Sequence, residues 1–386
     1  MDLGTYFTQI TLVEALLLVV FLIALGVQIY MYLYFYTGIL RHKKRVDKKQ
    51  IVTTEEQPPV SVIICAKNES DNLVTFLPLV LEQDYPNYEV IVVNDGSTDE
   101  TELLLKDLKA HYPQLYYTYM PEQTKIISRK KLALTIGIKA AKHELLLFTD
   151  ADCRPVSSYW IAETVRQFTP TTEFVLGYGA YLPAKGLLSH MISYDTLFIA
   201  MQYMGFAFRG QPYMGIGRNL AYRKETFFRH KGFAGTLHIA SGDDDLLVNM
   251  AATATNTNIT SVAQSVTQSV PKKTFSDWYH QKERHLTTAP MYNSKSKLMV
   301  GIEPLSRGLF YLSFIALCLF LNPLVLVIIG SLFLARYILQ LIVVNKTASQ
   351  LKERSFYSTI LIFDIILPLI TLFLMIFGQK KSFSWK

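Results

Sequence analysis

The chain has 386 residues, half of them hydrophobic, and a formal net charge of +7 at pH 7. This length allows two or three domains. Its three cysteines, Cys65, Cys153 and Cys318, are scattered without ligand spacing. That usage fits a reducing compartment and argues against both a disulfide scaffold and a zinc site.

The first predicted element is a membrane span. Ala15 to Tyr36 is almost unbroken in apolar character and about long enough to cross a bilayer. Six cations follow it, opposed only by Asp47: Arg41, Lys43, Lys44, Arg45, Lys48 and Lys49. The positive-inside rule then places the N-terminus outside and the following domain in the cytoplasm. Because the cluster abuts a span, we do not expect it to bind nucleic acid.

From Val60 onward, strand and helix patterns alternate, which predicts a mostly parallel sheet covered on both faces. Ser97 and Glu100 have the spacing of a capping box for a helix through Ala110. The expected strands are Val60–Cys65, Glu89–Asn94, Leu115–Tyr119 and Glu144–Phe148, and the expected helices include Ser70–Leu81 and Lys131–Ala141.

Polar clusters fall at the carboxyl ends of three of these strands, where ligands of such sheets bind. They are Lys67-Asn68-Glu69, Asn94-Asp95-Gly96-Ser97 and Asp150-Ala151-Asp152. Two carboxylates spaced by one residue can converge on a hard divalent cation that also binds substrate phosphates. The alternative is an Asp-rich turn. No G-x-G-x-x-G follows the first strand and no P-loop is present, which disfavours dinucleotide and P-loop sites.

The C-terminal part is predicted to return to the membrane. Leu309 to Val344 is too long for one span and contains Asn322-Pro323, which predicts a hairpin of two helices, the first one short. Phe356 to Gly378 is a third stretch. Lysines lie on both sides of it, so the topology of this end stays open. Arg336 and Asp364 lie at membrane depth, either as functional groups or as a snorkelling and a paired side chain.

Two segments between the core and these spans leave alternatives open. Leu187–Phe208 is rich in Met, Tyr and Phe, as expected of a core helix or of a surface that receives a lipid-borne acceptor. Lys272–Ser306 mixes Lys, Trp, Tyr and Met and is typical of an interfacial segment.

Several motifs, in order, resemble family-2 glycosyltransferases with the GT-A nucleotide-sugar-binding fold, and specifically the membrane-integrated branch of cellulose, chitin and hyaluronan synthases and ceramide glucosyltransferase. The resemblance covers about Pro59 to His285. It rests on Val60–Glu69, Val92–Asp99, Asp150–Asp152, Gly215–Tyr222, Ser241–Leu246 and Gln281-Lys282-Glu283-Arg284-His285.

The resemblance implies roles for individual residues. Asn68, Glu69 and Asp95 would line the nucleotide pocket, with Lys131 pairing with a phosphate. Asp150 and Asp152 would face the diphosphate, and Asp152 is the favoured direct ligand of Mg2+ or Mn2+. Asp243 aligns with the general base, with Asp244 as the alternative, and Arg284 would stabilise the leaving group. The remaining implied residues are Gln281 at the catalytic site and, on the acceptor side, Gly217, Asn219, Trp278 and His285.

Several of these residues also have a purely structural explanation. The three aspartates Asp243–Asp245 are also typical of a helix N-terminus. Lys131, Gln281 and Arg284 can belong to solvated helix faces, and Trp278 and His285 can be interfacial anchors. His285 stands where processive members usually carry Trp, which places long-chain synthesis in doubt, and Gly242 replaces an acid of the family motif.

We therefore expect an α/β protein whose GT-A domain is flanked by transmembrane helices. The predicted divisions are an anchor (1–40), a basic linker (41–58), the GT-A domain (59–270), an interfacial segment (271–307), about three spans (308–378) and a tail (379–386). The expected function is inverting transfer from a nucleotide-diphosphate sugar, preferably UDP-linked, to a polysaccharide or lipid acceptor at the cytoplasmic face of the inner or plasma membrane. The alternative is a non-catalytic scaffold or export subunit of a polysaccharide-synthesis complex.

Overall fold

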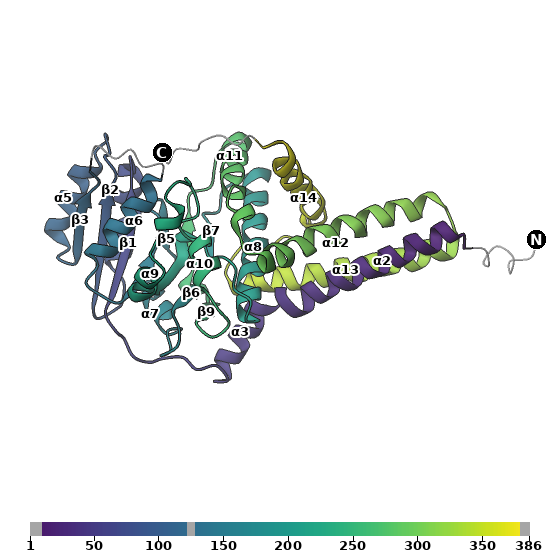
Figure 1. Cartoon of the computed structure of the whole chain (residues 1–386), viewed down its shortest axis with the longest axis horizontal. Coiled ribbons are helices and arrows are strands. Elements are labelled where there is room, and N and C mark those ends of the chain that lie inside the picture. Colours follow the sequence, from purple (N-terminus) through teal and green to yellow (C-terminus); the bar gives the residue numbers. More distant parts are fainter. Residues whose placement is uncertain (1–9, 122–127, 379–386) are drawn as a thin grey trace, which may run out of the picture.

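The computed structural model describes residues 10–121 and 128–378. Figure 1 shows an α/β domain at one end and long helices extending away from it, with helix α8 (Leu187–Phe208) between the two parts. The predicted tail, 379–386, and the first nine residues of the predicted anchor lie outside the described residues.

A seven-stranded sheet forms the centre of the α/β domain, in the order β3-β2-β1-β4-β8-β6-β9. The pairs β1–β2, β1–β4, β2–β3 and β6–β9 are parallel, whereas β8 runs antiparallel to both β4 and β6. The strands are β1 (Val60–Ala66), β2 (Tyr88–Asn94), β3 (Leu115–Tyr119), β4 (Leu145–Phe148), β6 (Phe174–Leu176), β8 (Leu220–Arg223) and β9 (Thr257–Ile259). This confirms the predicted mixed α/β fold with a mostly parallel sheet.

Helices cover both faces of the sheet, because its central strands are apolar on both sides. They are α4 (Ser70–Leu81), α5 (Thr101–His111), α6 (Arg129–Ala140), α7 (Trp160–Val165), α9 (Lys224–Arg229) and α10 (Asp245–Ala251). A further helix, α11 (Phe275–Leu286), lies beside α8, where Lys282 pairs with Asp195 at 2.5 Å. A second, three-stranded sheet has the order β5-β10-β7, with β5 (Cys153–Pro155), β7 (Gly179–Tyr181) and β10 (Thr267–Ser269).

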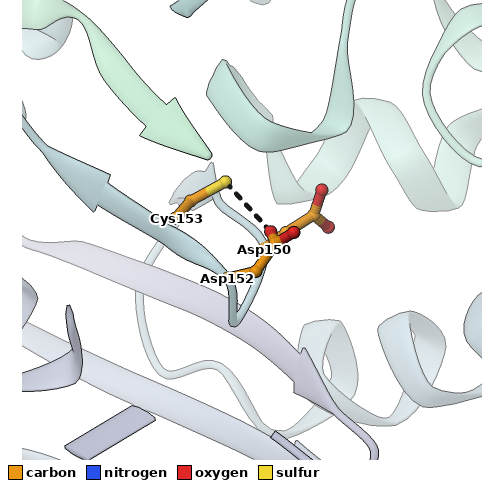
Figure 2. A group of neighbouring side chains, drawn as sticks. All are labelled: Asp150, Asp152 and Cys153. Carbon is orange, nitrogen blue, oxygen red and sulfur yellow. Dashed lines mark hydrogen bonds between the residues drawn. The ribbon is translucent and has the colours of Figure 1, made fainter. Parts of the chain in front are cut away.

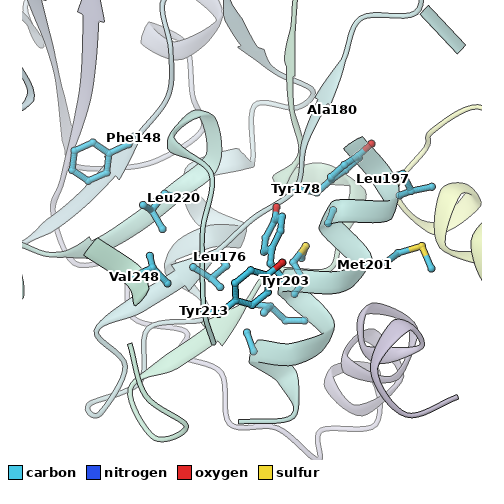
Figure 3. Close-up of a cluster of buried hydrophobic side chains, with 14 of the residues drawn as sticks. Phe148, Leu176, Tyr178, Ala180, Leu197, Met201, Tyr203, Tyr213, Leu220 and Val248 are labelled. Carbon is cyan, nitrogen blue, oxygen red and sulfur yellow. The ribbon is translucent and has the colours of Figure 1, made fainter. Parts of the chain in front are cut away.

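One core joins the sheet to helix α8. Leu197, Met201 and Tyr203 of α8 are fully or almost fully buried and belong to the same cluster as Leu176 and Leu220 of the sheet (Figure 3). The cluster continues into the N-terminal helix through Met31, Tyr36 and other residues. Of the two alternatives for Leu187–Phe208, the described contacts match the core helix.

Within the residues that the structure describes, four helices are long and apolar enough to cross a membrane. The first runs from Leu12 to Asp47 as α2 (Leu12–Tyr30), a π-helical segment (Met31–Tyr36) and α3 (Gly38–Asp47). The others are α12 (Ser294–Leu319), α13 (Pro323–Gln350) and α14 (Ile360–Phe377). In Figure 1, α2, α12 and α13 run side by side, and Asp364 of α14 joins this helix to α12 and α13 through ion pairs. The predicted hairpin is present with Pro323 opening its second helix, but its first helix is long, because it continues from Ser294.

Gly38 and Gly205 allow the first helix and α8 to cross closely. A Cβ at Gly38 would lie 2.7 Å from the Gly205 Cα, and a Cβ at Gly205 would lie 2.3 Å from the Phe35 carbonyl oxygen. Both distances are shorter than a real Cβ contact, so a side chain at either position would push the helices apart. The crossing fixes the α/β domain against the base of the first span.

The predicted capping box at Ser97 and Glu100 is absent. Glu100 is itself the N-cap position of α5 and makes no side-chain cap hydrogen bond. Asp99 fills the role instead, because its Oδ1 accepts a hydrogen bond from the Thr101 amide at 3.1 Å. The Ser97 hydroxyl is engaged elsewhere, where it accepts from the Asn68 amide at 2.9 Å. The competing contact comes from the loop after β1, which sequence spacing within one loop does not reveal.

Arg336 and Asp364 lie in a buried network between the long helices. Asp364 pairs with Arg336 at 3.0 Å and with Arg307 at 3.0 Å, and it accepts the Tyr311 hydroxyl at 2.6 Å. Arg307 also pairs with Glu303 at 2.6 Å, and Arg336 donates to the side-chain Oε1 of Gln28 at 2.8 Å. Of the two alternatives for Asp364, the paired side chain is the one observed, while Arg336 is buried rather than snorkelling.

Candidate active site

Asp95 lies at the carboxyl end of β2 and is almost completely buried. Its Oδ1 accepts hydrogen bonds from the Arg129 guanidinium, 2.8 Å from Nε. Its Oδ2 lies 4.0 Å from the Lys67 ammonium and accepts no hydrogen bond from any described residue. A buried carboxylate oxygen without a donor is costly, so this atom is ready to accept a hydrogen bond from a ligand.

The loop after β1 is tied to the loop after β2. Asn68 adopts a left-handed conformation with φ 54°, and its Oδ1 accepts the Thr98 amide at 2.8 Å. The Glu69 amide donates to Thr101 Oγ1 at 3.2 Å, while the Glu69 carboxylate accepts from Asn72 at 2.5 Å. The structure therefore brings Asn68 and Glu69 beside the Asp95 loop. The Asn68 side chain and the Glu69 amide hold the two segments together, whereas the Glu69 carboxylate is engaged by Asn72 at the start of its own helix.

Asp150 and Asp152 follow β4, and with Cys153 their ligand atoms all lie within 4.8 Å of one another (Figure 2). Asp152 accepts hydrogen bonds from Ser269 Oγ at 3.0 Å and from the Cys153 thiol at 3.4 Å. Burial, and then the charge of Asp150, raise the pKa of Asp152. Two carboxylates that repel each other at a partly open edge match the oxygen donors that a hard divalent cation prefers. Cys153 fits such a cation less well, because burial raises the pKa of its thiol.

Lys130 joins this pair to a third carboxylate. Its Nζ lies 3.2 Å from Asp150 Oδ1 and 3.0 Å from Asp243 Oδ2. Burial alone would lower the pKa of the Lys130 ammonium, but Asp150 and Asp243 outweigh it and raise that pKa. Asp150 and Asp243 are 93 positions apart in sequence, and one ammonium group touches both. They therefore face the same small space.

The three consecutive aspartates before and at the start of α10 have different environments. Burial raises the pKa of Asp243, but Lys130 outweighs it, so the net pKa is lowered and the carboxylate stays ionised. Burial and the neighbouring Asp243 and Asp245 raise the pKa of Asp244 to about 7. Asp244 accepts the backbone amides of Gly217 at 2.5 Å and of Asp245 at 2.8 Å. Asp245 is held by Thr288 Oγ1 at 2.5 Å and the Tyr292 hydroxyl at 2.7 Å.

Gly242 has a structural reason to replace the acid of the family motif. Its φ of 92° lies in the region that favours glycine. A Cβ at this position would also lie 2.5 Å from Leu246 Cδ1. The turn that presents Asp243 therefore requires a residue without a side chain.

Lys131 forms no ion pair with the carboxylates of the described residues. Its ammonium is buried and donates to the backbone carbonyls of Thr236 at 2.7 Å and Ile239 at 3.2 Å. Burial lowers its pKa. Lys131 thus holds the segment that leads to Asp243, while its neighbour Lys130 contacts Asp150 and Asp243.

On the predicted acceptor side, Gly217 and Asn219 differ in accessibility. The Gly217 amide binds Asp244, and Gly217 lines the pocket described below. Asn219 is buried, and its amide is fully used: Oδ1 accepts from Trp160 Nε1 at 3.1 Å, and Nδ2 donates to the carbonyls of Tyr178 and Ser265, each at 2.8 Å. Its buried side chain joins Trp160 of α7 to the segments around Tyr178 and Ser265, so we do not expect it to contact an acceptor directly.

Helix α11 carries the remaining predicted residues. Gln281 donates to the Tyr181 hydroxyl at 3.3 Å, and the Tyr181 ring stacks on the Arg218 guanidinium at 4.3 Å. Arg284 is half-buried one helical turn after Gln281, and His285 is exposed. Trp278 is almost fully buried in the core, packed beside Phe275. Its ring is thus a packing group, whereas Gln281 reaches toward the site through Tyr181.

A pocket at this edge of the sheet is lined by residues from β1, β4, α6, β8 and the loop before α10. They are Cys65, Lys130, Leu134, Phe148, Thr149, Asp150, Gly217, Leu220, Tyr222, Asp243 and Asp244. Sequence reasoning missed Lys130 and Arg129. The run Arg129-Lys130-Lys131 signals a cationic helix start, but only the rotation of α6 decides which of its side chains faces the carboxylates.

Comparison with known proteins identifies the family to which this domain belongs. Residues 61–235 match the family described as Glycosyl transferase family 2. The chain resembles the mannosyltransferase PcManGT from Pyrobaculum calidifontis, solved with GDP-Man and Mn2+, with a TM-score of 0.58 and 19% identity over 95% of this chain and 99% of that one. At this identity the likeness establishes the fold alone. Residues 61–235 therefore belong to glycosyltransferase family 2, with the GT-A fold, in a chain that also carries four long apolar helices.

Two curated proteins match part of the chain. Poly-beta-1,6-N-acetyl-D-glucosamine synthase of Staphylococcus epidermidis is 30% identical over 130 residues, which cover 32% of this chain and 30% of the synthase. Glycosyltransferase AglE of Haloferax volcanii is 32% identical over 126 residues, which cover 32% of this chain and 40% of AglE. The chain thus spans less than half the length of these relatives.

Proposed function

We propose that the chain is a membrane-integrated inverting glycosyltransferase. Its donor is a nucleotide-diphosphate sugar, UDP-linked by preference, and its acceptor is a glycan or a lipid at the cytoplasmic membrane face. The observation that carries the proposal is the contact of Lys130 with both Asp150 and Asp243. It brings a diphosphate-side carboxylate and the candidate base to the same space, as a direct displacement requires.

The donor's nucleotide is assigned to the end of β2. The free Oδ2 of Asp95 can accept a hydrogen bond from the base or ribose, and Arg129 fixes the orientation of that carboxylate. Lys67 adds positive charge beside Asp95, and Lys130 adds it in the pocket. We assign Lys130, rather than Lys131, to the diphosphate, because the Lys131 ammonium already donates hydrogen bonds to backbone carbonyls.

The residues present fit a divalent cation, Mg2+ or Mn2+. Asp150 and Asp152 supply oxygen donors at one edge, and their mutual repulsion is what a bound cation would relieve. When bound, such an ion stabilises the negative charge that grows on a leaving diphosphate. Asp152, oriented by Ser269, is the favoured direct ligand.

Asp243 is the candidate general base. Its carboxylate stays ionised beside Lys130, whereas both oxygens of Asp244 are occupied by backbone amides. In the proposed step, Asp243 takes the proton of an acceptor hydroxyl while that oxygen bonds to the anomeric carbon. The bond from that carbon to the donor phosphate oxygen breaks, and the nucleoside diphosphate leaves with the electron pair. Asp244 positions Gly217 at the acceptor side.

The alternative, a non-catalytic scaffold or export subunit, explains the site less well. Such a subunit has no chemical need for Asp95, Asp150, Asp152 and Asp243 to converge. It also has no need for a lysine that holds two of them together.

Release of nucleoside diphosphate tests the proposal. The full chain in lipid would receive UDP-, GDP- and dTDP-sugars with Mn2+ or Mg2+ and a membrane lipid extract as acceptor source. We expect metal-dependent release from one donor, and loss of about 10²–10⁴-fold in rate for Asp243→Asn with donor binding retained. Asp107→Asn, which changes an exposed aspartate on α5, is the matched control. Release at the wild-type rate from Asp243→Asn would remove the base assignment, and donor binding without release from the wild type would favour the scaffold.

A further inference from the structure

A cluster of three arginines lies where the first long helix meets the α/β domain. It consists of Arg41 and Arg45 of α3 and Arg209, which follows α8, and we refer to it as the arginine cluster. Arg45 and Arg209 both lie over the Phe208 ring, at 5.2 and 5.4 Å from its centroid. Arg209 also stacks on the Tyr34 ring at 4.1 Å. Side chains from two distant segments thus converge on one pair of aromatic rings.

The π-helical segment before α3 helps to assemble the cluster. Two consecutive carbonyl groups of this segment accept from arginines: Leu33 from Arg41 Nη2 at 3.0 Å, and Tyr34 from Arg209 Nε at 2.9 Å. A π-helical turn shifts the backbone pairing and is frequent at functional sites. Here the shift gives Arg41 and Arg209 neighbouring anchor points, which hold two guanidinium groups near each other.

The cluster has no acidic partner among the described residues. None of its three arginines appears in an ion pair there, although Asp47 on the same helix is available and pairs with Lys43 instead, at 2.7 Å. Arg209 Nη2 is buried and donates to no described residue. Burial, together with the charges of Arg41 and Arg45, lowers the pKa of Arg209. Three cations held together without an anion are under mutual repulsion that an anionic ligand would relieve.

The position of the cluster identifies the source of that anion. The apolar span leads directly into it, and Tyr30 and Tyr34 on the last turns are 53% and 37% exposed. Exposed tyrosines at the end of a span are typical of the headgroup level of a bilayer. Arg41 and Arg45 are exposed at the same level. The planar guanidinium suits bidentate binding of phosphate.

We propose that the arginine cluster binds the phosphate of an anionic phospholipid headgroup and so fastens the α/β domain to the membrane surface. This inference rests on the membrane insertion proposed above, but not on transferase activity. The site is separate from the carboxylate pocket, since no residue of the cluster lines that pocket.

Lipid retention measured by native mass spectrometry tests the proposal. The full chain in detergent would be titrated with phosphatidylglycerol, phosphatidylcholine or inorganic phosphate. We expect one tightly retained phosphatidylglycerol and at least about tenfold weaker retention in Arg209→Gln, because this variant removes a charge and its charge-assisted hydrogen bonds to the phosphate. Lys44→Gln, which removes an equal charge from the same helix outside the cluster, should retain the lipid as the wild type does.

Because Arg209 packs on the Tyr34 ring, its substitution can also disturb the fold. Arg45→Gln therefore serves as a second variant, since the Arg45 side chain is exposed. It should also weaken retention while the unfolding temperature stays at the wild-type value. Equal retention of both lipids, or undiminished retention in both arginine variants, would overturn the proposal. Inorganic phosphate that binds as tightly as the lipid, or UDP that displaces the lipid, would overturn it as well. Resistance of the wild type to alkaline extraction from membranes checks the insertion separately.

Discussion

The active-site pocket and the helix bundle each contain a cluster of buried charges, and the two clusters are balanced differently. In the bundle, Asp364 is paired with two arginines, and Glu303 shares one of them. At the sheet edge, one lysine forms ion pairs with two carboxylates while three more aspartates lie close by: Asp152, Asp244 and Asp245. The bundle network is neutral and closed, whereas the pocket carries an excess of negative charge beside an opening.

This difference in net charge distinguishes a cluster that only stabilises the fold from a site that binds ligands. Unpaired buried charge is expensive, so a cluster that serves only to join helices is expected to be neutralised within the chain. An excess of carboxylates persists where a cation completes the site. The raised pKa values of Asp152 and Asp244 report the same excess, because burial and neighbouring carboxylates disfavour their ionised forms.

The largest effect should come from breaking the pocket. Asp152→Ala should abolish turnover, because it removes the favoured cation ligand, while the unfolding temperature stays close to that of the wild type. Nucleoside-diphosphate release and thermal unfolding would be measured on the same preparation, with Asp107→Asn as the control. Turnover at the wild-type rate would remove Asp152 from the metal assignment.

Breaking the bundle should act on stability instead. Asp364→Leu leaves Arg307 and Arg336 without their shared carboxylate, and removing one partner of a buried pair typically costs about 3–5 kcal/mol. Denaturant unfolding in detergent micelles measures the loss. Adding Arg336→Leu to Asp364→Leu should recover part of it, because one of the two stranded charges is gone. A double variant less stable by the full sum of both single losses would contradict the paired network.

The pH dependence of stability should distinguish the pocket from the helix bundle. The pKa of Asp244 is about 7 in the folded chain, above its ordinary value of 3.8. The folded state therefore keeps a proton that the unfolded chain releases, so this contribution to stability is present at low pH and is lost as the pH rises through about 7. In the presence of EDTA, Asp244→Asn should lose less stability than the wild type between pH 5 and pH 8. Parallel unfolding curves across that range would show that Asp244 does not hold the proton.

The smallest effect should come from an exposed pair outside both clusters. Lys43 and Asp47 form a 2.7 Å ion pair one turn apart on α3. Exposed pairs of this spacing contribute about 0.3–0.5 kcal/mol. Lys43→Gln should therefore change the free energy of unfolding by no more than that, and a loss above 1 kcal/mol would mean that Lys43 takes part in something other than this pair.

The sequence was sufficient to predict the sheet and its edge, because local patterns carry them. The apolar runs of β1, β2 and β4 are bounded by polar turns, and Ser70–Leu81, Leu115–Tyr119 and Leu187–Phe208 have the predicted bounds. The acidic groups after those strands meet because parallel strands end at one edge. The strand order alone therefore predicts that these acidic groups lie close together, without knowledge of side-chain orientation.

What sequence reasoning missed depends on the orientation of side chains in three dimensions. Lys130 and Lys131 are adjacent and chemically identical, yet the turn of α6 sends one to the carboxylates and the other to backbone carbonyls. Asn219 lies in a family motif, but its amide is used by Trp160 and by the backbone carbonyls of Tyr178 and Ser265. Asp364 has partners in two other helices, at positions 307 and 336, and helix packing alone brings these together.

The central claim is that the surplus carboxylates of the pocket hold a divalent cation together with a nucleoside diphosphate. Electron paramagnetic resonance of Mn2+ tests it directly, with the full chain in lipid, with and without UDP, beside Asp152→Ala. We predict that the wild type immobilises about one Mn2+ per chain once UDP is present, as a site completed by substrate phosphates requires, and that Asp152→Ala does not. Equal Mn2+ binding by both proteins, or none by the wild type with any nucleoside diphosphate, would contradict the account.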